Sequence, residues 1–457
     1  MPDTHYEILI IGAGQAGPGL AVALAKRGKH VALAERKDIG GSCVNFGCTP
    51  TKAAIASARV AHLARRAGEF GLRIPTVEVD FAAVLERAKS IVVKSRTGLQ
   101  QWLEGTENLT LLKAHARFEG KDGDRFRVNV GGQRVTAAQV VLDTGTRSVI
   151  PPIEGLDKVD YIHAGNWLDT PELPDRLAVI GAGYIGLEMA QFYQRLGSRV
   201  IVIEGAGQVA GNEDPEIAAA LQQLLENEGV EFRLNTQVTR IEGRTGKLRL
   251  ILNGAGSAAV EATDVFVATG RRANTDDLGL ETIGVATSKR GIVTADERLS
   301  TNVKGVWVAG DIRGGPMFTH TAWDDYRILE SQIAGDGSKT LDRVIPYAVF
   351  TDPELGRVGM TEREARAAGH AVRIGRFELR RNGKAVEVGE TAGFIKVVAD
   401  ERSQRLLGAA VLANEGAELV HIYIDLMNAR APYPVIRDAV YIHPTLAEAV
   451  QSAVATL

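Results

Sequence analysis

The most restrictive feature of this sequence is a glycine-rich segment that occurs twice, 169 residues apart. The first copy reads EILIIGAGQAGPGLAVALAKRGKHVALAE over residues 7–35, and the second reads RLAVIGAGYIGLEMAQFYQRLGSRVIVIE over residues 176–204. Each copy has a short apolar run, a glycine turn, a helix-forming stretch and a second apolar run that ends in glutamate. Short apolar runs of this kind are typical of buried parallel strands. Each copy therefore predicts a strand–helix–strand unit of an α/β fold.

The glycine spacing within each copy suits a dinucleotide. The first glycine permits a tight turn, the second lets a pyrophosphate approach the backbone, and the third lets the helix pack closely on the strand. The helix N-terminus offers free N–H groups to the phosphates, and the terminal glutamate can accept hydrogen bonds from the adenosine ribose. The matching residues are Gly12, Gly14, Gly17 and Glu35 in the first copy and Gly181, Gly183, Gly186 and Glu204 in the second. Two such turns in register predict two dinucleotide sites.

Glu204 also bears on the choice of nicotinamide cofactor. A carboxylate at this position repels a ribose 2′-phosphate and accepts a hydrogen bond from a free 2′-hydroxyl. Residues 205–210 contain no Arg or Lys to hold such a phosphate. The second site is therefore expected to prefer NADH over NADPH.

Length and charge exclude several classes of protein. The 457 residues allow about three domains, and the 56 acidic against 53 basic residues give no basic excess that would favour nucleic acid. The apolar run 8–25 contains five glycine or proline residues, which suits a strand, a turn and a helix better than a signal peptide or a membrane span. We expect a cytoplasmic protein without nucleic-acid or membrane partners.

The two cysteines of the chain, Cys43 and Cys48, lie in the segment GGSCVNFGCTPTK. Two cysteines this close are a coincidence, part of a metal site or a redox pair. A structural zinc site wants about four ligands, and no CxxC or CxxH partner is present. In a regular helix their Cα atoms would lie roughly 8.5 Å apart, beyond the about 7 Å that a disulfide allows. A disulfide here requires a distorted turn, which Gly47 permits.

Two further regions complete the pattern. The first consists of three glycine motifs, DTGTRS (143–148), ATGRRAN (268–274) and GVWVAGDIRGGP (305–316), which each contain an apolar strand or follow one. Asp311 in the third motif is either an acid that holds a flavin ribityl hydroxyl or an ordinary turn or helix-cap aspartate. The second region is the C-terminal third: from about residue 346 the sequence changes to alternating strands, followed by helices at about 415–430 and 445–455. This pattern predicts an α+β domain in the last third of the chain, with a binding or assembly role.

These motifs, in this order, resemble the pyridine nucleotide–disulfide oxidoreductase family over essentially the whole chain. The resemblance is greatest to its mercuric-reductase-like branch, which includes flavoproteins linked to reactive-chlorine resistance and copper(II) reduction. It implies an α/β fold with two Rossmann-like dinucleotide-binding domains and a C-terminal α+β dimerisation domain. The implied boundaries are 1–150 and 273–343 for the FAD-binding domain, 151–272 for the NAD-binding domain and 344–457 for dimerisation.

The resemblance also implies a role for individual residues. Cys48 would be the thiol next to the flavin, Cys43 the thiol that meets the substrate, and Lys52 would pair with Glu188 beside the flavin. His443 and Glu448 would form an acid–base pair supplied by the partner subunit of a homodimer. The residues implied at FAD are Gly12, Gly14, Gly17, Glu35, Lys52, Asp311, Thr319 and His320, and those implied at NAD are Gly181, Gly183, Tyr184, Gly186, Glu204 and Gly270.

The expected function is electron transfer from NADH through FAD and the Cys43–Cys48 disulfide to a small disulfide or dithiol, as in dihydrolipoamide dehydrogenase. No metal cofactor is expected. One alternative is a copper(II) or mercuric-type metal-ion reductase that uses the same cysteines, and another is a redox sensor. Tyr441 stands where disulfide-reducing relatives usually carry histidine, DTGT replaces the more usual ATG, and the C-terminus lacks the cysteine pair of mercuric reductase.

Overall fold

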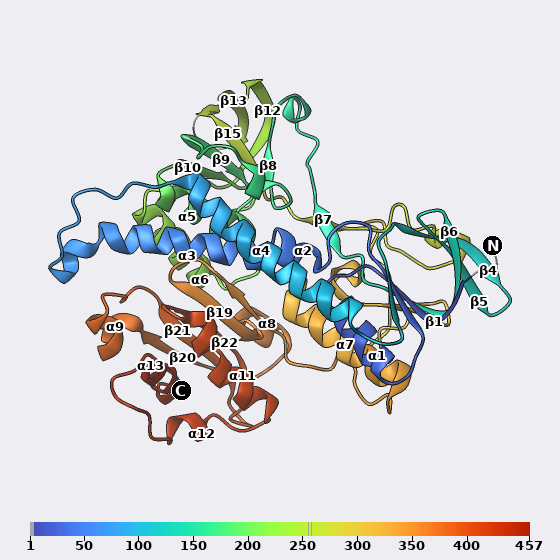
Figure 1. The fold of residues 1–457 in the computed structure, drawn as a ribbon. Coiled ribbons are helices and arrows are strands. Elements are labelled where there is room, and N and C mark those ends of the chain that lie inside the picture. The colour runs from blue at the N-terminus through green and yellow to red at the C-terminus, as the bar shows by residue number, and fades with distance from the viewer. Residues whose placement is uncertain (1–3, 255, 257) are drawn as a thin grey trace.

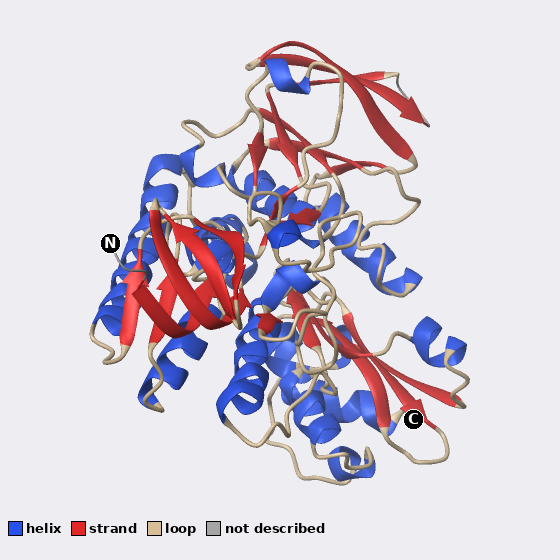
Figure 2. Ribbon diagram, turned by 90° about the vertical axis from the view of Figure 1, so that its right-hand side faces the viewer, coloured by secondary structure: helices blue, strands red, loops and turns tan. Residues whose placement is uncertain are grey.

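The computed structural model describes residues 4–254, 256 and 258–457. Figure 1 shows three units: the N-terminal sheet at the right, a second parallel sheet at the top and the C-terminal sheet at the lower left. The strands gather into separate sheets with helices packed between them (Figure 2). The predicted α/β class is confirmed, with two glycine-turn units and a separate α+β unit.

The N-terminal unit is built on the sheet order β3-β2-β1-β6-β5-β4, with β17 paired to β6. Strands β1, β2, β3, β6 and β17 run parallel, and β4, β5 and β6 form an antiparallel meander. The strands are β1 Thr4–Ile11, β2 Val31–Ala34, β3 Leu109–Leu112, β4 Ala116–Asp122, β5 Arg125–Val130, β6 Gln133–Leu142 and β17 Val306–Val308. The helices are α1 Gly17–Lys26, α2 Gly41–Asn45, α3 Cys48–Arg65, α4 Phe81–Glu104 and α7 Thr319–Ala334, with 3-10 turns η1 Ala67–Phe70, η4 Leu280–Thr282 and η5 Gly310–Arg313.

The second unit repeats the first around the parallel order β11-β10-β9-β15-β8. The repeat extends to the strand register, since Ile11 lies opposite Ala34 and Ile180, 169 residues later, lies opposite Ile203. Its strands are β8 Ile162–His163, β9 Arg176–Ile180, β10 Arg199–Ile203, β11 Glu231–Arg233 and β15 Asp264–Val267, and its helices are α5 Tyr184–Leu196 and α6 Pro215–Asn227, with η2 Leu156–Lys158 and η3 Trp167–Asp169. A three-stranded sheet of β12 Thr236–Arg244, β13 Lys247–Gly254 and β14 Ala259–Ala262 covers it, and β7 Thr146–Ser148 pairs with β16 Arg271–Ala273.

The C-terminal unit is the antiparallel sheet β18-β19-β22-β21-β20. The alternating strands predicted from about residue 346 are present, whereas the helix expected at 415–430 is divided into two. The strands are β18 Pro346–Val349, β19 Glu354–Gly359, β20 Val372–Glu378, β21 Phe394–Asp400 and β22 Leu406–Ala413. The helices are α8 Glu362–Ala367, α9 Gly383–Glu387, α10 Gly416–Leu419, α11 His421–Asn428, α12 Pro434–Arg437 and α13 Ala447–Ala455, with η6 Leu379–Arg381.

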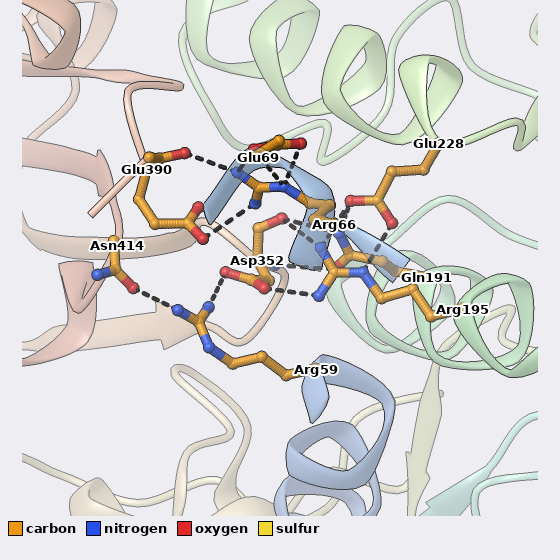
Figure 3. Close-up of polar contacts among 10 residues, drawn as sticks. Arg59, Arg66, Glu69, Gln191, Arg195, Glu228, Asp352, Glu390 and Asn414 are labelled. Atoms are coloured by element: carbon orange, nitrogen blue, oxygen red, sulfur yellow. Dashed lines mark hydrogen bonds and ion pairs between the residues drawn. The ribbon is translucent and has the colours of Figure 1, made fainter. Parts of the chain in front are cut away.

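Helix α3 is held between the other two units. One continuous apolar core contains residues of α3, α4, the second unit and the C-terminal sheet. A polar network joins the same three parts (Figure 3). The Arg195 guanidinium of α5 lies 2.7 Å from Glu228 and 2.6 Å from Asp352, and Arg59 of α3 bonds Asp352 from the other side. The helix that begins at Cys48 therefore has a fixed position between the units.

Among the described residues, no helix combines the length and the apolar character that a membrane crossing requires.

Candidate functional site

A large cavity brings together segments that are far apart in the sequence. Its volume is about 1440 Å³, above the roughly 300–1,000 Å³ of most small-ligand pockets. Residues from both glycine turns, the cysteine segment and the loop before α7 line it. The predicted site residues in the lining are Gly12, Gly14, Glu35, Cys43, Cys48, Lys52, Gly183, Tyr184, Glu188, Gly270, Asp311, Thr319 and His320.

The first glycine turn has the tight backbone geometry expected of a dinucleotide-binding turn. Gly12 has φ +104°, and a Cβ there would lie 2.2 Å from the Asp143 carbonyl oxygen, so glycine alone fits. A Cβ on Gly17 would lie 2.4 Å from the Gly12 carbonyl oxygen, as close packing of α1 on the strand requires. Glu35 directly follows β2 and accepts the N–H of Ala13 at 2.9 Å, which directs its carboxylate to the turn.

The second glycine turn repeats this arrangement. Gly181 has φ +107°, and a Cβ on Gly186 would lie 2.0 Å from the Gly181 carbonyl oxygen. Glu204 accepts the N–H of Ala182 at 2.7 Å and that of Ala206 at 2.8 Å, as Glu35 accepts those of Ala13 and Lys37. Gly17, Gly181, Gly186 and Glu204 stand outside the cavity lining. These residues belong to the structure of the two turns and do not face the cavity.

The cysteines stand on the two sides of a helix break. Cys43 belongs to α2, which ends at Asn45, and Cys48 is the first residue of α3. Gly47 between them has φ −99° and ψ −122°, so the chain leaves the helical conformation there. The distorted turn expected between the cysteines is present. Both side chains are free thiols in this structure, and Cys48 is exposed to the cavity.

The two thiols differ in acidity. A hydrogen bond from Cys43 holds the pKa of Cys48 at about 6, and a hydrogen bond to Thr319 and the charge of Lys52 act in the same direction. The same bond to Cys48, with burial, raises the pKa of Cys43 well above that of an ordinary thiol. The first proton lost by the pair therefore leaves a thiolate on Cys48, with Cys43 as its hydrogen-bond donor.

Lys52 and Glu188 form an ion pair close to Cys48. The Lys52 ammonium lies 2.7 Å from Oε2 of Glu188, and Oε1 of Glu188 accepts the N–H of Phe350 at 2.8 Å. The pairing implied by the resemblance is thus present in the geometry. It joins α3, α5 and the segment after β18.

The remaining FAD candidates, Thr319, His320 and Asp311, also line the cavity. The Thr319 hydroxyl lies 3.1 Å from Sγ of Cys48 at the start of α7. His320 contacts the Pro346 carbonyl oxygen at 2.7 Å, and burial lowers the pKa of its imidazole. Asp311 accepts the Thr146 hydroxyl at 2.9 Å, with Arg271 at 3.8 Å.

A buried acid that the sequence did not indicate controls the position of Tyr184. Glu213 is fully buried and accepts the hydroxyls of Tyr184 at 2.7 Å and Tyr347 at 2.6 Å. Arg357 lies 2.9 Å from its other oxygen. Tyr347 and Arg357 come from the C-terminal unit, more than a hundred residues away, and no local pattern relates them to Glu213.

His443 and Glu448 form the expected pair, but at a distance from the cysteines. Nδ1 of His443 lies 3.0 Å from Oε1 of Glu448, and the Thr445 N–H bonds Oε2 at 2.8 Å. Neither side chain lines the cavity of its own chain. The segment is open to solvent, with Val440 and Ile442 100% and 78% exposed.

Comparison with known proteins decides the family. Residues 6–325 match the model for pyridine nucleotide-disulphide oxidoreductases, and residues 345–454 match the dimerisation domain of the same family. The chain belongs to this family. It is therefore an oxidoreductase of a family whose members bind FAD and a pyridine nucleotide, and its dimerisation domain supports a homodimer.

Within the pyridine nucleotide-disulphide oxidoreductases, similar relatives carry different names. A probable pyridine nucleotide-disulfide oxidoreductase RclA from Escherichia coli is 32% identical over 97% of both chains. A dihydrolipoyl dehydrogenase from Cupriavidus necator is 33% identical over 98% of this chain and 97% of its own. A solved Cu(II) complex of the HOCl-induced flavoprotein disulfide reductase RclA from Escherichia coli has 31% identity and a TM-score of 0.87, and the match covers 96% of this chain and 98% of that one.

Proposed function

We propose that this protein is an FAD-dependent NADH:disulfide oxidoreductase that passes electrons through Cys43 and Cys48 to a small disulfide. The cysteine pair carries the proposal, because two thiols of unequal acidity share one cavity with two nucleotide turns. FAD, when bound, supplies two-electron chemistry between NADH and the cysteine pair. Lipoamide is the first substrate to test, since one relative is named a dihydrolipoyl dehydrogenase.

The cysteines have separate tasks in this proposal. The Cys43 thiolate attacks one sulfur of the substrate disulfide, and the first substrate thiol leaves with a proton. Cys48 then attacks the Cys43 sulfur, which releases the second thiol and restores the Cys43–Cys48 disulfide. Each turnover gives two electrons and two protons to the substrate. Because the pKa of Cys43 is raised, its attack requires a base.

We propose that His443 of the partner subunit is this base. Its bond to Glu448 orients the imidazole, and its exposure leaves it available to a second chain. The exposed apolar side chains of Val440 and Ile442 beside it support burial of this segment in a subunit interface. The same imidazole then returns its proton to the leaving thiol.

We further propose that the domain boundaries lie near residues 150, 272 and 343, and that NADH is preferred over NADPH. The preference is supported by Glu204, whose carboxylate is fixed by two backbone N–H groups at the second turn. The cytoplasmic location expected from the sequence stays a prediction.

The test is anaerobic reduction of the holoenzyme by NADH, followed by a panel of acceptors. We expect a long-wavelength thiolate–flavin absorbance after reduction, and turnover with lipoamide or another small disulfide. Cys43→Ser should abolish disulfide turnover while NADH still bleaches the flavin. Unchanged turnover of every disulfide by Cys43→Ser contradicts the proposal.

A second candidate function is reduction of a metal ion such as copper(II) by the same residues. It is favoured by the similarity to a flavoprotein whose solved structure is a Cu(II) complex. It is also favoured by Tyr441, which lies two residues before His443. The variant His443→Ala distinguishes the two functions. Disulfide turnover requires the proton transfer and should collapse, whereas electron delivery to copper(II) does not require it and should survive.

A further inference from the structure

Asp143 and Ala268 occupy equivalent positions in the two nucleotide units. Each follows the last paired residue of its strand and donates its N–H to the neighbouring strand, Asp143 to Ile11 and Ala268 to Ile180, both at 2.8 Å. Their carbonyl oxygens approach the first glycine of each turn in the same way. The two units therefore differ here in one side chain, a carboxyl in the first and a methyl in the second.

The Asp143 carboxyl fills the space beneath the first glycine turn. Its Oδ2 accepts the Gly17 N–H, at the start of α1, at 2.7 Å. A Cβ on Gly14 would lie 2.8 Å from Oδ2, and one on Gly310 would lie 3.0 Å from Oδ1. The side chain is 5% exposed and borders the cavity. In the second unit, a Cβ on Gly183 would meet nothing within 4 Å.

The charged groups around Asp143 are predominantly acidic. Glu35 faces it from the end of β2, Asp311 from η5 and Asp325 from α7. The nearby cations are already paired, Arg271 lying near Asp311, and Arg313 and Arg343 bonding Asp325. Burial raises the pKa of Asp143 well above that of an ordinary carboxyl, the Gly17 N–H opposes this, and the three acids add to it.

We propose that Asp143 is a neutral carboxylic acid that donates a hydrogen bond to the pyrophosphate of the FAD held by the first glycine turn. This rests on the proposed assignment of FAD to that turn. The Gly17 N–H occupies Oδ2, which leaves Oδ1 to carry the proton. An ionised Asp143 would place a negative charge next to two phosphates at one helix N-terminus, whereas the neutral acid adds a donor there. Asp143 thus becomes a cofactor-binding residue that the second unit lacks.

The test compares Asp143→Asn and Asp143→Ala with the wild-type holoenzyme. Asparagine keeps an acceptor for Gly17 and a donor for the phosphate without any charge. Alanine reproduces the second unit, where the same turn forms around Ala268. We expect wild type and Asp143→Asn to release FAD at similar rates at neutral pH, and Asp143→Ala to release it roughly tenfold faster. Release is followed by the rise in free-flavin fluorescence after dilution.

Infrared spectroscopy measures the protonation state of the Asp143 carboxyl directly. The wild-type holoenzyme at pH 7 should show a protonated-carboxyl band that Asp143→Asn lacks. Absence of that band, or equal FAD retention by Asp143→Ala and Asp143→Asn, overturns the proposal. NADH affinity at the second turn should be unchanged in both variants and serves as the control for folding. A preparation without flavin absorbance contradicts the proposed function itself, whereas a flavin-containing protein without the band contradicts only the role of Asp143.

Discussion

Lys52 reaches from α3 to Glu188 of α5, with 2.7 Å between the ammonium nitrogen and the carboxylate oxygen. The ammonium also lies 4.5 Å from the centre of the Phe350 ring, and Glu188 accepts the Phe350 N–H. Lys52 lies one helical turn after Cys48, so both charges of the pair act on that thiol, Lys52 lowering its pKa and Glu188 raising it. The ion pair is thus a means of adjusting thiolate formation as well as a link between units.

The two members of this ion pair should have opposite effects on Cys48. In a Cys43→Ser background, where Cys48 is the single thiol, Lys52→Met should raise the pKa of Cys48 by roughly one pH unit and Glu188→Gln should lower it by a similar amount. The pH dependence of alkylation by iodoacetamide measures both changes. Shifts in the same direction would show that the variants act through altered packing rather than charge.

The hydrogen bond between the cysteines leads to a second prediction. Cys43→Ala removes the donor that holds the pKa of Cys48 at about 6, so that pKa should rise toward the ordinary thiol value near 8.5. Cys43→Ser keeps a hydroxyl donor, so the pKa of Cys48 should stay closer to its wild-type value. Both variants have lost the reactive pair, so alkylation of Cys48 between pH 5 and 9 is the measurement. Equal profiles for the two variants would exclude the hydrogen bond as the main cause.

The sequence predicted the parts of the fold that repeat locally. Gly12 and Gly181 begin equivalent turns, and the 169-residue spacing extends to the pairing of Ile180 with Ile203. Short apolar runs predict buried parallel strands, and helix geometry indicates that a disulfide between the cysteines requires a distorted turn, which Gly47 permits. These features depend on residues close together in the chain, which is why they were predictable.

The contacts that complete the site depend on tertiary folding. Glu213 is joined to Tyr347 and Arg357 only after the C-terminal unit packs on the second unit. Arg233 is another case, because it lies beside Ile203 only through the pairing of β11 with β10. The Arg233 carbonyl oxygen accepts the Glu204 N–H at 2.9 Å, and this basic neighbour could not be inferred from residues 205–210. Asp143 was visible as a departure from the usual motif, but its burial against Gly14 required the structure.

The network around Arg195 should stabilise the arrangement of the three units. Arg195→Met leaves the carboxylates of Glu228 and Asp352 without their buried partner, and should destabilise the protein by about 3–5 kcal/mol. Arg199→Ala removes an exposed pair with Asp175 and should cost less than about 1 kcal/mol. Thermal unfolding at one fixed protein concentration compares the two variants. A similar unfolding temperature for both would contradict a stabilising role.

The same network predicts an acid-sensitive part of the stability. Burial alone would raise the pKa of Asp352, but the charges and hydrogen bonds of Arg195 and Arg59 outweigh it and hold the pKa below the ordinary value. A carboxylate whose pKa is lowered by folding stabilises the fold at pH values above its unfolded-state pKa, near 3.9. This contribution is lost as the pH falls through the pKa of the folded state. The difference in unfolding temperature between wild type and Arg195→Met should therefore be full at pH 6–8 and shrink below about pH 4. A difference that persists unchanged in acid would show that Arg195 acts through packing.

The repeat offers a matched control for nicotinamide selectivity, because Glu204 and Glu35 make the same backbone hydrogen bonds in different units. Glu204→Gln keeps one oxygen to accept a backbone N–H, loses the second of these contacts, and removes the charge that disfavours a 2′-phosphate. The ratio of kcat/KM for NADH to that for NADPH should fall by about tenfold, mainly through improved use of NADPH. Glu35→Gln makes the identical change at the first turn and should speed FAD release while leaving the ratio unaltered. If the ratio is unchanged in Glu204→Gln, another group such as Arg233 decides between the cofactors, and Glu204 serves only to shape the turn.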